Sequence, residues 1–414
     1  MADYFKNIRH YPVKSQVRPG AILNQIPDSP PSHCESIQVI FDFFINIIVP
    51  GMTKCQLPNC HSYFTGKSSY PCVLADMLTA SLAAQCMLWE TSPAATELEE
   101  KMLDWLKQLL GLPKEWTGVI QDTASTANLV AIISAREWKS DWRVNASGYN
   151  GQEGFTIYCS TQAHSSVSKA VRIAGLGMNS IRKIEVDDQF ALIPDKLREQ
   201  IQKDVEAGFN PLLTVATIGT TGTTAVDPVK EISEICQERG MWLHVDAAWA
   251  GTAMILPEYQ WMSEGLENVH SFVFNPHKWM FTNFDCSAYF VKDPEILLKT
   301  FALVPEYLKT GTVGVRNYSD WGIQLGRRFR ALKLWFVLRN FGTDGLRKKV
   351  AEHIAWGKEI AEKMDQHPDF QLMTPAPLGV VCFRYYPKAE ATDYNQLNRH
   401  LLDVINQSGK LYIT

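Results

Sequence analysis

Short apolar segments alternate with helical ones between residues 70 and 336, and this alternation restricts the fold more than any other feature. The runs PLLTVATIG and MWLHVDAAW are rich in β-branched and aromatic residues, as strands are. Between them, Asp227 stands at the N-cap position of a predicted helix and Gly240 at its end. A strand, a helix and a second strand in this order predict a mostly parallel sheet covered by helices, and therefore an α/β fold.

Local composition divides the chain into three predicted domains. Residues 1–69 are rich in Pro, Ser and His, with a helical pattern around 35–49, and predict an N-terminal helical arm or cap. Residues 70–336 form the predicted large domain. Residues 337–414 start with a charged helical stretch, continue into the strand-like run GVVCFRYYP and predict a small C-terminal domain. The final LYIT has the pattern of a strand interior, so we expect this last domain to be truncated.

Charge and composition exclude several classes of partner. The net charge of −4 and the pI of about 6.2 provide no basic surface for nucleic acid, and no basic amphipathic segment suggests a membrane surface. The most apolar run, residues 37–49, is too short to cross a bilayer, so we interpret it as a helix that docks on an apolar partner such as a second subunit. The nine cysteines form no CxxC pair and no signal peptide is recognisable, which predicts reduced thiols in a cytoplasmic protein.

Polar residues follow several predicted strands, where open α/β sheets bind their ligands. The residues at these strand ends are His164, Thr220, Thr221, Asp246 and Lys278. Taken singly, each is explained more simply as a turn former, a helix cap or a satisfied interior group. A metal-binding site is a more specific alternative to these structural roles, and it would have four candidate ligands: His164, His244, Asp246 and His277. A protonated Lys278 would repel the cation and could not ligate it, so we predict no metal.

Lys278 decides between these alternatives. It lies in the apolar stretch FNPHKWMF, and a lysine is almost never fully buried unless it is paired or reactive. Burial lowers the pKa of an amine and frees its lone pair for Schiff-base chemistry. A carboxylate such as Asp246 would suit a pyridine nitrogen that must stay protonated. Ala124 and Ser125 precede a predicted helix, where an anion binds well. Together these residues predict a site for pyridoxal 5'-phosphate (PLP).

The motifs around these residues resemble those of the PLP-dependent aromatic L-amino-acid decarboxylases, the group II family that acts on tryptophan, tyrosine or dopa. The resemblance covers the whole chain and rests on these segments: SYFTGKSSYPCVLADML, SPAATELE, QDTASTANLVA, QAHSSVSKA, TIGTTGTTAVDPV, HVDAAWAG, NPHKWMFTNFDCSAYFV and WGIQLGRRFRALKLW. It implies PLP-dependent fold type I (aspartate aminotransferase-like), with a mostly parallel seven-stranded sheet in the large domain and a small C-terminal α/β domain. The family continues past LYIT, which again implies truncation.

The resemblance also implies a role for each matching residue. Lys278 would hold the cofactor as a Schiff base, Asp246 would pair with the pyridine nitrogen, and His164 would stack over the ring. Four residues would help hold the phosphate: Ala124, Ser125, Asn275 and His277. Thr221 would contact the cofactor near the substrate carboxylate.

Tyr318, in VRNYSDW, matches the loop tyrosine that returns a proton to the substrate carbon after CO2 leaves, as implied by the resemblance. The small and polar residues of the preceding stretch, 306–317, are typical of a flexible lid, although an ordinary surface loop would have the same composition. Family members that make aldehydes carry Phe in place of this tyrosine, so the resemblance implies an amine product.

The substrate pocket implied by the resemblance contains Tyr63, Phe64, Thr65, Met87 and Gly326. The family usually has Trp at Cys55, Pro at Thr65 and Phe at Met87, and residue 87 is expected to reach the pocket of a partner subunit. We therefore expect a homodimeric carboxy-lyase that converts an aromatic L-amino acid (tryptophan, dopa, tyrosine or phenylalanine) to its amine and CO2. Two alternatives stay open, which are a decarboxylase of an acidic or aliphatic amino acid and an inactive dimeric homologue.

Overall fold

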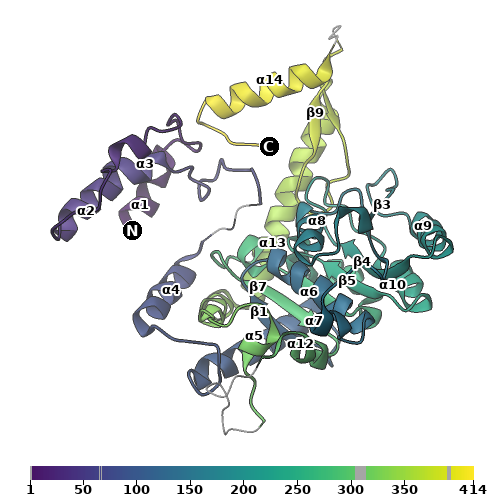
Figure 1. Ribbon diagram of the computed structural model, residues 1–414. Coiled ribbons are helices and arrows are strands. Elements are labelled where there is room, and N and C mark those ends of the chain that lie inside the picture. Colours follow the sequence, from purple (N-terminus) through teal and green to yellow (C-terminus); the bar gives the residue numbers. More distant parts are fainter. Residues whose placement is uncertain (1, 65, 67, 304–313, 389–392) are drawn as a thin grey trace. The chain divides into compact units, whose positions relative to one another are not determined.

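The computed structural model describes residues 2–64, 66, 68–303, 314–388 and 393–414 (Figure 1). The chain forms two compact units, each built from more than one segment. The smaller unit consists of Met1–Lys67, Pro368–Gln371 and Arg384–Thr414, and the larger unit of Ser68–His367 and Leu372–Phe383. The larger unit carries the sheet and most of the predicted site residues.

A seven-stranded sheet forms the centre of the larger unit (Figure 1). Its strands are β1 (Thr117–Gln121), β2 (Phe155–Ser160), β3 (Ile181–Ile184), β4 (Asn210–Thr217), β5 (Trp242–Asp246), β6 (Ser271–Phe274) and β7 (Ser287–Val291). Their order is β1-β7-β6-β5-β4-β2-β3, and β7 alone among them runs in the direction opposite to the other six. The predicted mostly parallel, seven-stranded α/β fold is confirmed.

Helices cover both faces of this sheet. They are α5 (Pro93–Leu110), α6 (Ala124–Lys139), α8 (Ser165–Ile173), α9 (Pro194–Glu206), α10 (Val229–Glu238), α12 (Pro294–Phe301) and α13 (Arg330–Gln366). Leu243 and Val245 of β5 pack in one apolar cluster with residues of α5, α9, α10 and α13. Trp242, on the opposite face of β5, packs in a second cluster with residues of α6, α8 and α12. This alternation follows from the two-residue period of a strand, which sends successive side chains to opposite faces.

Two helices of the larger unit differ in how their ends are capped. The helix α5 ends at Gly111, which adopts a left-handed conformation with φ of +67°. Asp227, in contrast, does not cap α10. Its carboxylate accepts hydrogen bonds from the backbone N–H groups of Thr217 (2.7 Å) and Leu192 (2.8 Å), and the N-cap residue is Pro228. Asp227 therefore ties the end of β4 to a neighbouring segment.

The long helix α13 crosses one of the two predicted domain boundaries. The predicted boundary between residues 336 and 337 falls inside this helix, whereas the boundary predicted after residue 69 lies two residues from the observed one. α13 packs along α5 and along α4 (Tyr70–Leu82), so the whole helix belongs to the larger unit. A charged, helical sequence does not reveal which neighbour its apolar stripe will contact.

The smaller unit contains α1 (Ala2–Asn7), α2 (Ile37–Phe43), a π-helical stretch (Phe44–Ile48), α3 (Val49–Gly51) and α14 (Tyr394–Gln407). The helical pattern expected around 35–49 is thus confirmed. Tyr412 joins the two ends of this unit, because its backbone N–H donates to the Asn59 carbonyl (3.0 Å) and its carbonyl accepts from His61 N–H (2.8 Å). A two-stranded sheet pairs β8 (Phe370–Leu372) with β9 (Phe383–Tyr385). Among the described residues, no helix has the length and apolar character needed to cross a membrane.

Candidate active site

The parallel strands bring the predicted site residues to one edge of the sheet. Asp246 is the last residue of β5, where it lies opposite Thr217 at the end of β4 and opposite Val273 in β6. Lys278 follows β6 on the short helix α11 (Pro276–Trp279). The carboxyl ends of these strands therefore assemble residues that are far apart in sequence, as the general rule for open α/β sheets requires.

Lys278 has the electrostatic setting of a reactive amine. Its side chain is largely buried, and this burial lowers the pKa of the ammonium group, while the nearby Asp246 carboxylate acts in the opposite direction. Its backbone N–H donates to the carbonyl of Asn275 (2.9 Å), which fixes the turn at the start of α11. A lowered pKa increases the fraction of neutral amine, which is the nucleophilic form.

The Asp246 carboxylate is buried and held on both oxygens. Oδ1 accepts a hydrogen bond from the backbone N–H of Ala248 (3.0 Å), and Oδ2 accepts one from the side-chain amide of Asn128 (3.0 Å). These two donors fix the plane of the carboxylate. The carboxylate therefore stands beside Lys278 as a fixed negative charge.

His164 is the N-cap residue of α8. Its Nδ1 accepts the backbone N–H of Ser166 (3.1 Å) and lies 2.8 Å from the Ser166 hydroxyl. The side chain is otherwise exposed, so a ring could lie against its face. The sequence predicted a stacking role for His164, and the structure adds that its edge is anchored by a helix terminus.

The predicted phosphate-holding residues come from two elements. Ala124 and Ser125 form the first turn of α6, where helix geometry leaves backbone N–H groups without an intrahelical acceptor. Asn275 and His277 flank the start of α11 and contact the beginning of β7. The Asn275 side-chain oxygen accepts from the hydroxyl of Ser287 (2.6 Å). The arrangement gives one helix terminus able to attract an anion.

His277 is buried in a neutral form. Its Nδ1 accepts the backbone N–H of Cys286 (2.9 Å), and burial lowers its pKa to about 4, with the nearby Lys278 charge acting in the same direction. Because Nδ1 is an acceptor, a neutral ring carries its proton on Nε2. That N–H group is the donor with which His277 could contribute to binding.

Thr220 and Thr221 differ in the burial of their side chains. Thr220 is buried, and its hydroxyl oxygen accepts the backbone N–H of Ala225 (3.0 Å) and lies 2.7 Å from the Thr223 hydroxyl. Thr220 therefore stabilises the turn after β4. The Thr221 side chain is exposed, which is compatible with its predicted contact to a ligand.

Tyr318 is a core residue, which corrects the predicted position of this side chain on a mobile lid. It begins a 3-10 helix (Tyr318–Trp321) and is only 2% exposed. Its ring packs edge-on against Trp321, with centroids 5.5 Å apart, and the Arg327 guanidinium lies 4.8 Å from its centroid. Burial raises the pKa of its hydroxyl, which makes it a weaker acid than an exposed tyrosine. The predicted lid, 306–317, is described only from residue 314.

The residues predicted to contact the substrate side chain are divided between the two units. Tyr63 and Phe64, in the smaller unit, have φ angles of +62° and +51°, a conformation that costs energy for residues other than glycine. Thr65 lies outside the described residues. Met87, in the larger unit, is half-buried, and its carbonyl accepts the backbone N–H of Ser319 (3.0 Å).

Gly326 is exposed in the larger unit, with open space where a Cβ would stand. Neither its φ angle nor a close neighbour therefore demands glycine at this position. A larger side chain would fit at this position, so the absence of a side chain at Gly326 leaves open space beside its backbone.

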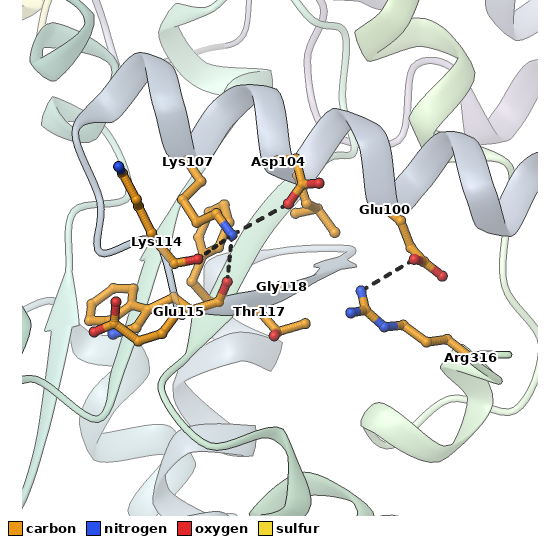
Figure 2. Close-up of a pocket in the computed structure, with 11 residues that line it drawn as sticks. Glu100, Asp104, Lys107, Lys114, Glu115, Thr117, Gly118 and Arg316 are labelled. Atoms are coloured by element: carbon orange, nitrogen blue, oxygen red, sulfur yellow. Dashed lines mark hydrogen bonds and ion pairs between the residues drawn. The ribbon is translucent and has the colours of Figure 1, made fainter. Parts of the chain in front are cut away.

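A polar pocket at the amino end of β1 is not this site (Figure 2). Lys107 lines it and forms an ion pair with Asp104 (3.3 Å), and Arg316 lies across from Glu100 at 3.6 Å. The pocket contains none of the predicted site residues. Because it lies at the amino end of β1, its position does not match that of a ligand site at the carboxyl ends of the parallel strands.

Asn128 and His244 complete the candidate site, although the sequence analysis assigned neither to cofactor binding. His244 hydrogen-bonds Asn128 (2.8 Å) and Ser271 (2.8 Å), and the described residues contain no cluster suited to a metal ion. Asn128 is fully buried in α6, between Asp246 and Ser166. The signal that could have identified it is an amide in the otherwise apolar stretch ANLVAII, since a buried amide needs several partners.

Comparison with known proteins places this geometry in context. The family model described as the pyridoxal-dependent decarboxylase conserved domain matches residues 19–386. The chain is 42% identical to a phenylacetaldehyde synthase of Arabidopsis thaliana, over 100% of this chain and 86% of that protein. It is 40% identical to tyrosine decarboxylase 2 of Narcissus pseudonarcissus, over 100% and 84%.

Solved structures agree with these sequence matches. The crystal structure of Catharanthus roseus tryptophan decarboxylase in complex with L-tryptophan superposes with a TM-score of 0.93 at 38% identity, covering 100% of this chain and 88% of that one. The crystal structure of Oryza sativa TDC with PLP and tryptamine gives a TM-score of 0.96 at 34% identity, covering 99% and 87%.

Proposed function

Because the chain belongs to the pyridoxal-dependent decarboxylase family, we propose that it decarboxylates an aromatic L-amino acid to the corresponding amine and CO2. The predicted family and cofactor are confirmed, so the protein is a PLP-dependent carboxy-lyase of the aromatic amino-acid decarboxylase type. The observation that carries the proposal is the pairing of Lys278, whose pKa is lowered by burial, with the fixed carboxylate of Asp246.

The residues at the strand ends fit PLP. A buried amine suits the aldehyde carbon, a buried carboxylate suits the pyridine nitrogen, and the first turn of a sixteen-residue helix suits the phosphate. Lys278, Asp246 and Ala124 supply these three groups. His164 adds an anchored ring with an exposed face. We propose that these four residues, with Ser125, hold the cofactor.

Bound PLP supplies an electron-withdrawing ring that takes up the electron pair released when the bond between Cα and the carboxylate breaks. The chain's own residues prepare this step. Lys278 would hold the cofactor through Nζ, and the lowered pKa of this amine increases the fraction that is neutral and nucleophilic. Asp246 would stabilise a proton on the pyridine nitrogen by its negative charge. His164 would lie against the ring and would exclude water from that face.

An aromatic substrate is supported by the relatives and by the open space beside Gly326. The relatives include a protein named tyrosine decarboxylase and another named tryptophan decarboxylase. An acidic substrate would need a cation in the side-chain pocket, and the sequence offers no obvious candidate for one. The open space at Gly326 and the flexible thioether of Met87 would admit a large ring. An inactive homologue would have no reason to retain Lys278, Asp246 and His164.

Aldehyde formation is the second candidate, because relatives at 42% and 41% identity are named phenylacetaldehyde synthases. That reaction consumes O2 and water with the amino acid and yields an aldehyde, CO2, ammonia and hydrogen peroxide. It competes when no acid protonates the substrate carbon promptly after CO2 leaves. Since Tyr318 is buried, we propose that the proton comes instead from Tyr307, which belongs to the predicted lid and lies outside the described residues.

The test is a panel of amino acids incubated with the PLP-loaded protein under air. Tryptophan, tyrosine, dopa and phenylalanine are compared with glutamate and leucine, and CO2, amine, aldehyde and peroxide are measured in the same samples. We expect CO2 and amine in equal amounts from at least one aromatic substrate, with little peroxide. Equal amounts of CO2, aldehyde and peroxide would establish the second candidate, and no CO2 from any amino acid would refute both.

We also propose that the protein is a homodimer and acts in a reducing compartment such as the cytoplasm. The helix α2 and the stretch after it expose a group of large apolar side chains: Ile37, Val39, Ile40, Phe41, Phe44 and Ile45. A contiguous exposed apolar patch of this kind supports association, and a second copy of the chain is the partner expected for this family. All nine cysteines are free thiols, which supports a reducing compartment.

A further inference from the structure

A continuous network of buried hydrogen bonds lies behind the candidate site. We propose that Asn128 is the positioning residue of this site, because its one amide group orients both the Asp246 carboxylate and, through Ser166, the His164 ring. This inference rests on the proposed function only in that it takes Asp246 and His164 to be the cofactor's partners.

Asn128 uses its full hydrogen-bonding capacity. Its Nδ2 donates to Asp246 Oδ2 (3.0 Å) and to Ser166 Oγ (2.9 Å), and its Oδ1 lies 2.8 Å from Nε2 of His244. The residue is fully buried on α6, and these partners come from β5 and α8. A side-chain amide has two donor hydrogens and one acceptor oxygen, so the three contacts occupy all of them.

The direction of these hydrogen bonds is determined by the next shell of partners. Burial lowers the pKa of His244 to about 4, so its ring is neutral near pH 7. Because the Asp246 carboxylate only accepts, Asn128 presents Nδ2 to it and Oδ1 to His244 Nε2, and His244 Nδ1 is left to accept from the Ser271 hydroxyl (2.8 Å). The proton of a neutral His244 is then on Nε2 and is donated to the Asn128 oxygen. This prevents a flip of the Asn128 amide.

The hydrogen bonds continue from Asn128 through Ser166 to the exposed ring of His164. With its oxygen committed to His244, Asn128 must present both N–H groups to Asp246 and Ser166. Ser166 Oγ accepts one of them, so its own hydrogen is free for His164 Nδ1 (2.8 Å). The ring of His164 therefore carries its proton on Nε2 when neutral. The Asn128 amide thus links the orientation of the Asp246 carboxylate to that of the His164 ring, although these two residues are 82 positions apart in the chain.

The experiment measures cofactor affinity, which does not depend on turnover. Apoprotein is titrated with PLP and binding is followed by visible absorbance, for the wild type and for Asn128→Ala, Asn128→Asp and Ser166→Ala. Asn128→Asp keeps the shape of the side chain but removes both N–H donors and adds a carboxylate beside Asp246. The matched control is Ser134→Ala, because Ser134 is equally buried on the same helix and is not part of the network. Urea unfolding of each apoprotein checks that it is folded.

We expect both Asn128 variants to weaken PLP binding about 10-fold or more, the change typical of losing a hydrogen bond to a charged group. Ser166→Ala removes the hydroxyl link to His164, whose Nδ1 keeps the backbone N–H of residue 166, so its loss should be smaller than that of Asn128→Ala. Ser134→Ala should bind within about twofold of wild type, since about 0.4 kcal/mol corresponds to that factor.

Two results would overturn the inference. One is wild-type affinity in folded Asn128→Ala or Asn128→Asp protein, and the other is an equal loss in Ser134→Ala. If Asn128→Ala does not fold, then Ser166→Ala and Asn128→Asp carry the test. A wild-type protein that binds PLP but releases no CO2 would contradict the proposed function without affecting this comparison, so the two failures are distinguishable.

Discussion

The indole rings of Trp249 and Trp279 stack face to face, with centroids 4.3 Å apart and an interplanar angle of 2°. Trp249 follows Asp246 by three residues, and Trp279 directly follows Lys278. The stack therefore joins the turn after β5 to the helix α11 that carries the lysine. A backbone hydrogen bond from Asn275 N–H to the Ala248 carbonyl (2.9 Å) joins the same two segments. The distance between the amine and the carboxylate thus depends on packing outside the site.

Replacing Trp279 by Ala should weaken both the fold and cofactor binding. The change removes the stack on Trp249 and the hydrogen bond from Trp279 Nε1 to His353 (3.0 Å), and it leaves a cavity. We expect a loss of about 3 to 5 kcal/mol in the free energy of unfolding. Urea unfolding of the apoprotein and PLP titration provide the two measurements. Trp261→Ala is the control, because Trp261 is 52% exposed and should change both by little. Unchanged PLP affinity in Trp279→Ala would show that the stack does not position Lys278.

Lys278→Ala should abolish turnover. PLP should still bind, more weakly, through the first turn of α6 and Asp246, but the yellow colour of the covalent adduct should appear only when an external amine is supplied. Borohydride reduction followed by peptide mass spectrometry should place the cofactor mass on Lys278 in the wild type. The control is Lys292→Ala, which removes an exposed lysine that donates to the Glu267 carbonyl. Wild-type turnover in Lys278→Ala would refute the assignment.

Tyr318→Phe and Tyr307→Phe should have different effects. Tyr318→Phe keeps the ring that contacts Trp321 and Arg327, so we expect an unfolding free energy within about 1 kcal/mol of wild type and an unchanged ratio of products. Tyr307→Phe should slow amine release and raise aldehyde, ammonia and peroxide while CO2 release continues. Amine, aldehyde and peroxide are measured together under air for both variants. If only Tyr318→Phe shifts the product ratio, the buried tyrosine is the donor after all.

The apoprotein should lose stability when the pH falls from about 6.5 to 4. His244, His270 and His277 have pKa values lowered to about 4 by burial, so between these pH values the unfolded chain binds protons that the folded chain does not. Asp227 acts in the opposite direction, because burial raises its pKa to about 6 and its protonation favours the folded state on acidification. Glu100 and Asp320, whose pKa values burial also raises, act like Asp227, whereas Asp285, whose pKa is lowered by its hydrogen bond to Arg330, acts like the histidines. We expect the three large histidine shifts to dominate, which gives a net loss of stability.

The measurement is the urea midpoint at several pH values between 4 and 7. His270→Gln removes one of the three histidines without touching the candidate site, and it should make the dependence shallower. One group contributes at most about 1.4 kcal/mol per pH unit. Stability that is constant or rises on acidification would contradict the buried, neutral state of these histidines.

A double substitution on α2, Ile37→Ser with Phe41→Ser, should shift the protein from dimer to monomer. These side chains are 77% and 53% exposed in the isolated chain, and their burial against a second copy would favour association. We expect the dimer dissociation constant to rise at least about 10-fold, since burying each large apolar side chain contributes about 1.5 to 3 kcal/mol. Sedimentation equilibrium gives the constant. Gln38→Ser on the same helix is the control, and an unchanged dimer in the double variant would place the interface elsewhere.

Local patterns in the sequence predicted the α/β class of the fold and the candidate residues at the strand ends. The alternation of strands and helices is a short-range property, so it predicted a parallel sheet before any contact was known. Lys278 stood out because an ammonium group in an apolar stretch needs a chemical reason, and Asp246 and His164 followed from their places after predicted strands.

Long-range contacts decided the rest. Asn128 and Asp246 are 118 residues apart, and no local pattern could reveal that one amide would be shared between Asp246, Ser166 and His244. Tyr318 had the polar neighbours of a surface loop, but the position of Trp321 and Arg327 made it a core residue. The sequence by itself thus determined the order of the elements and the reactive groups at their ends, because these depend on neighbours along the chain. Tertiary structure decided burial and hydrogen-bond partners, because these depend on groups that only folding brings together.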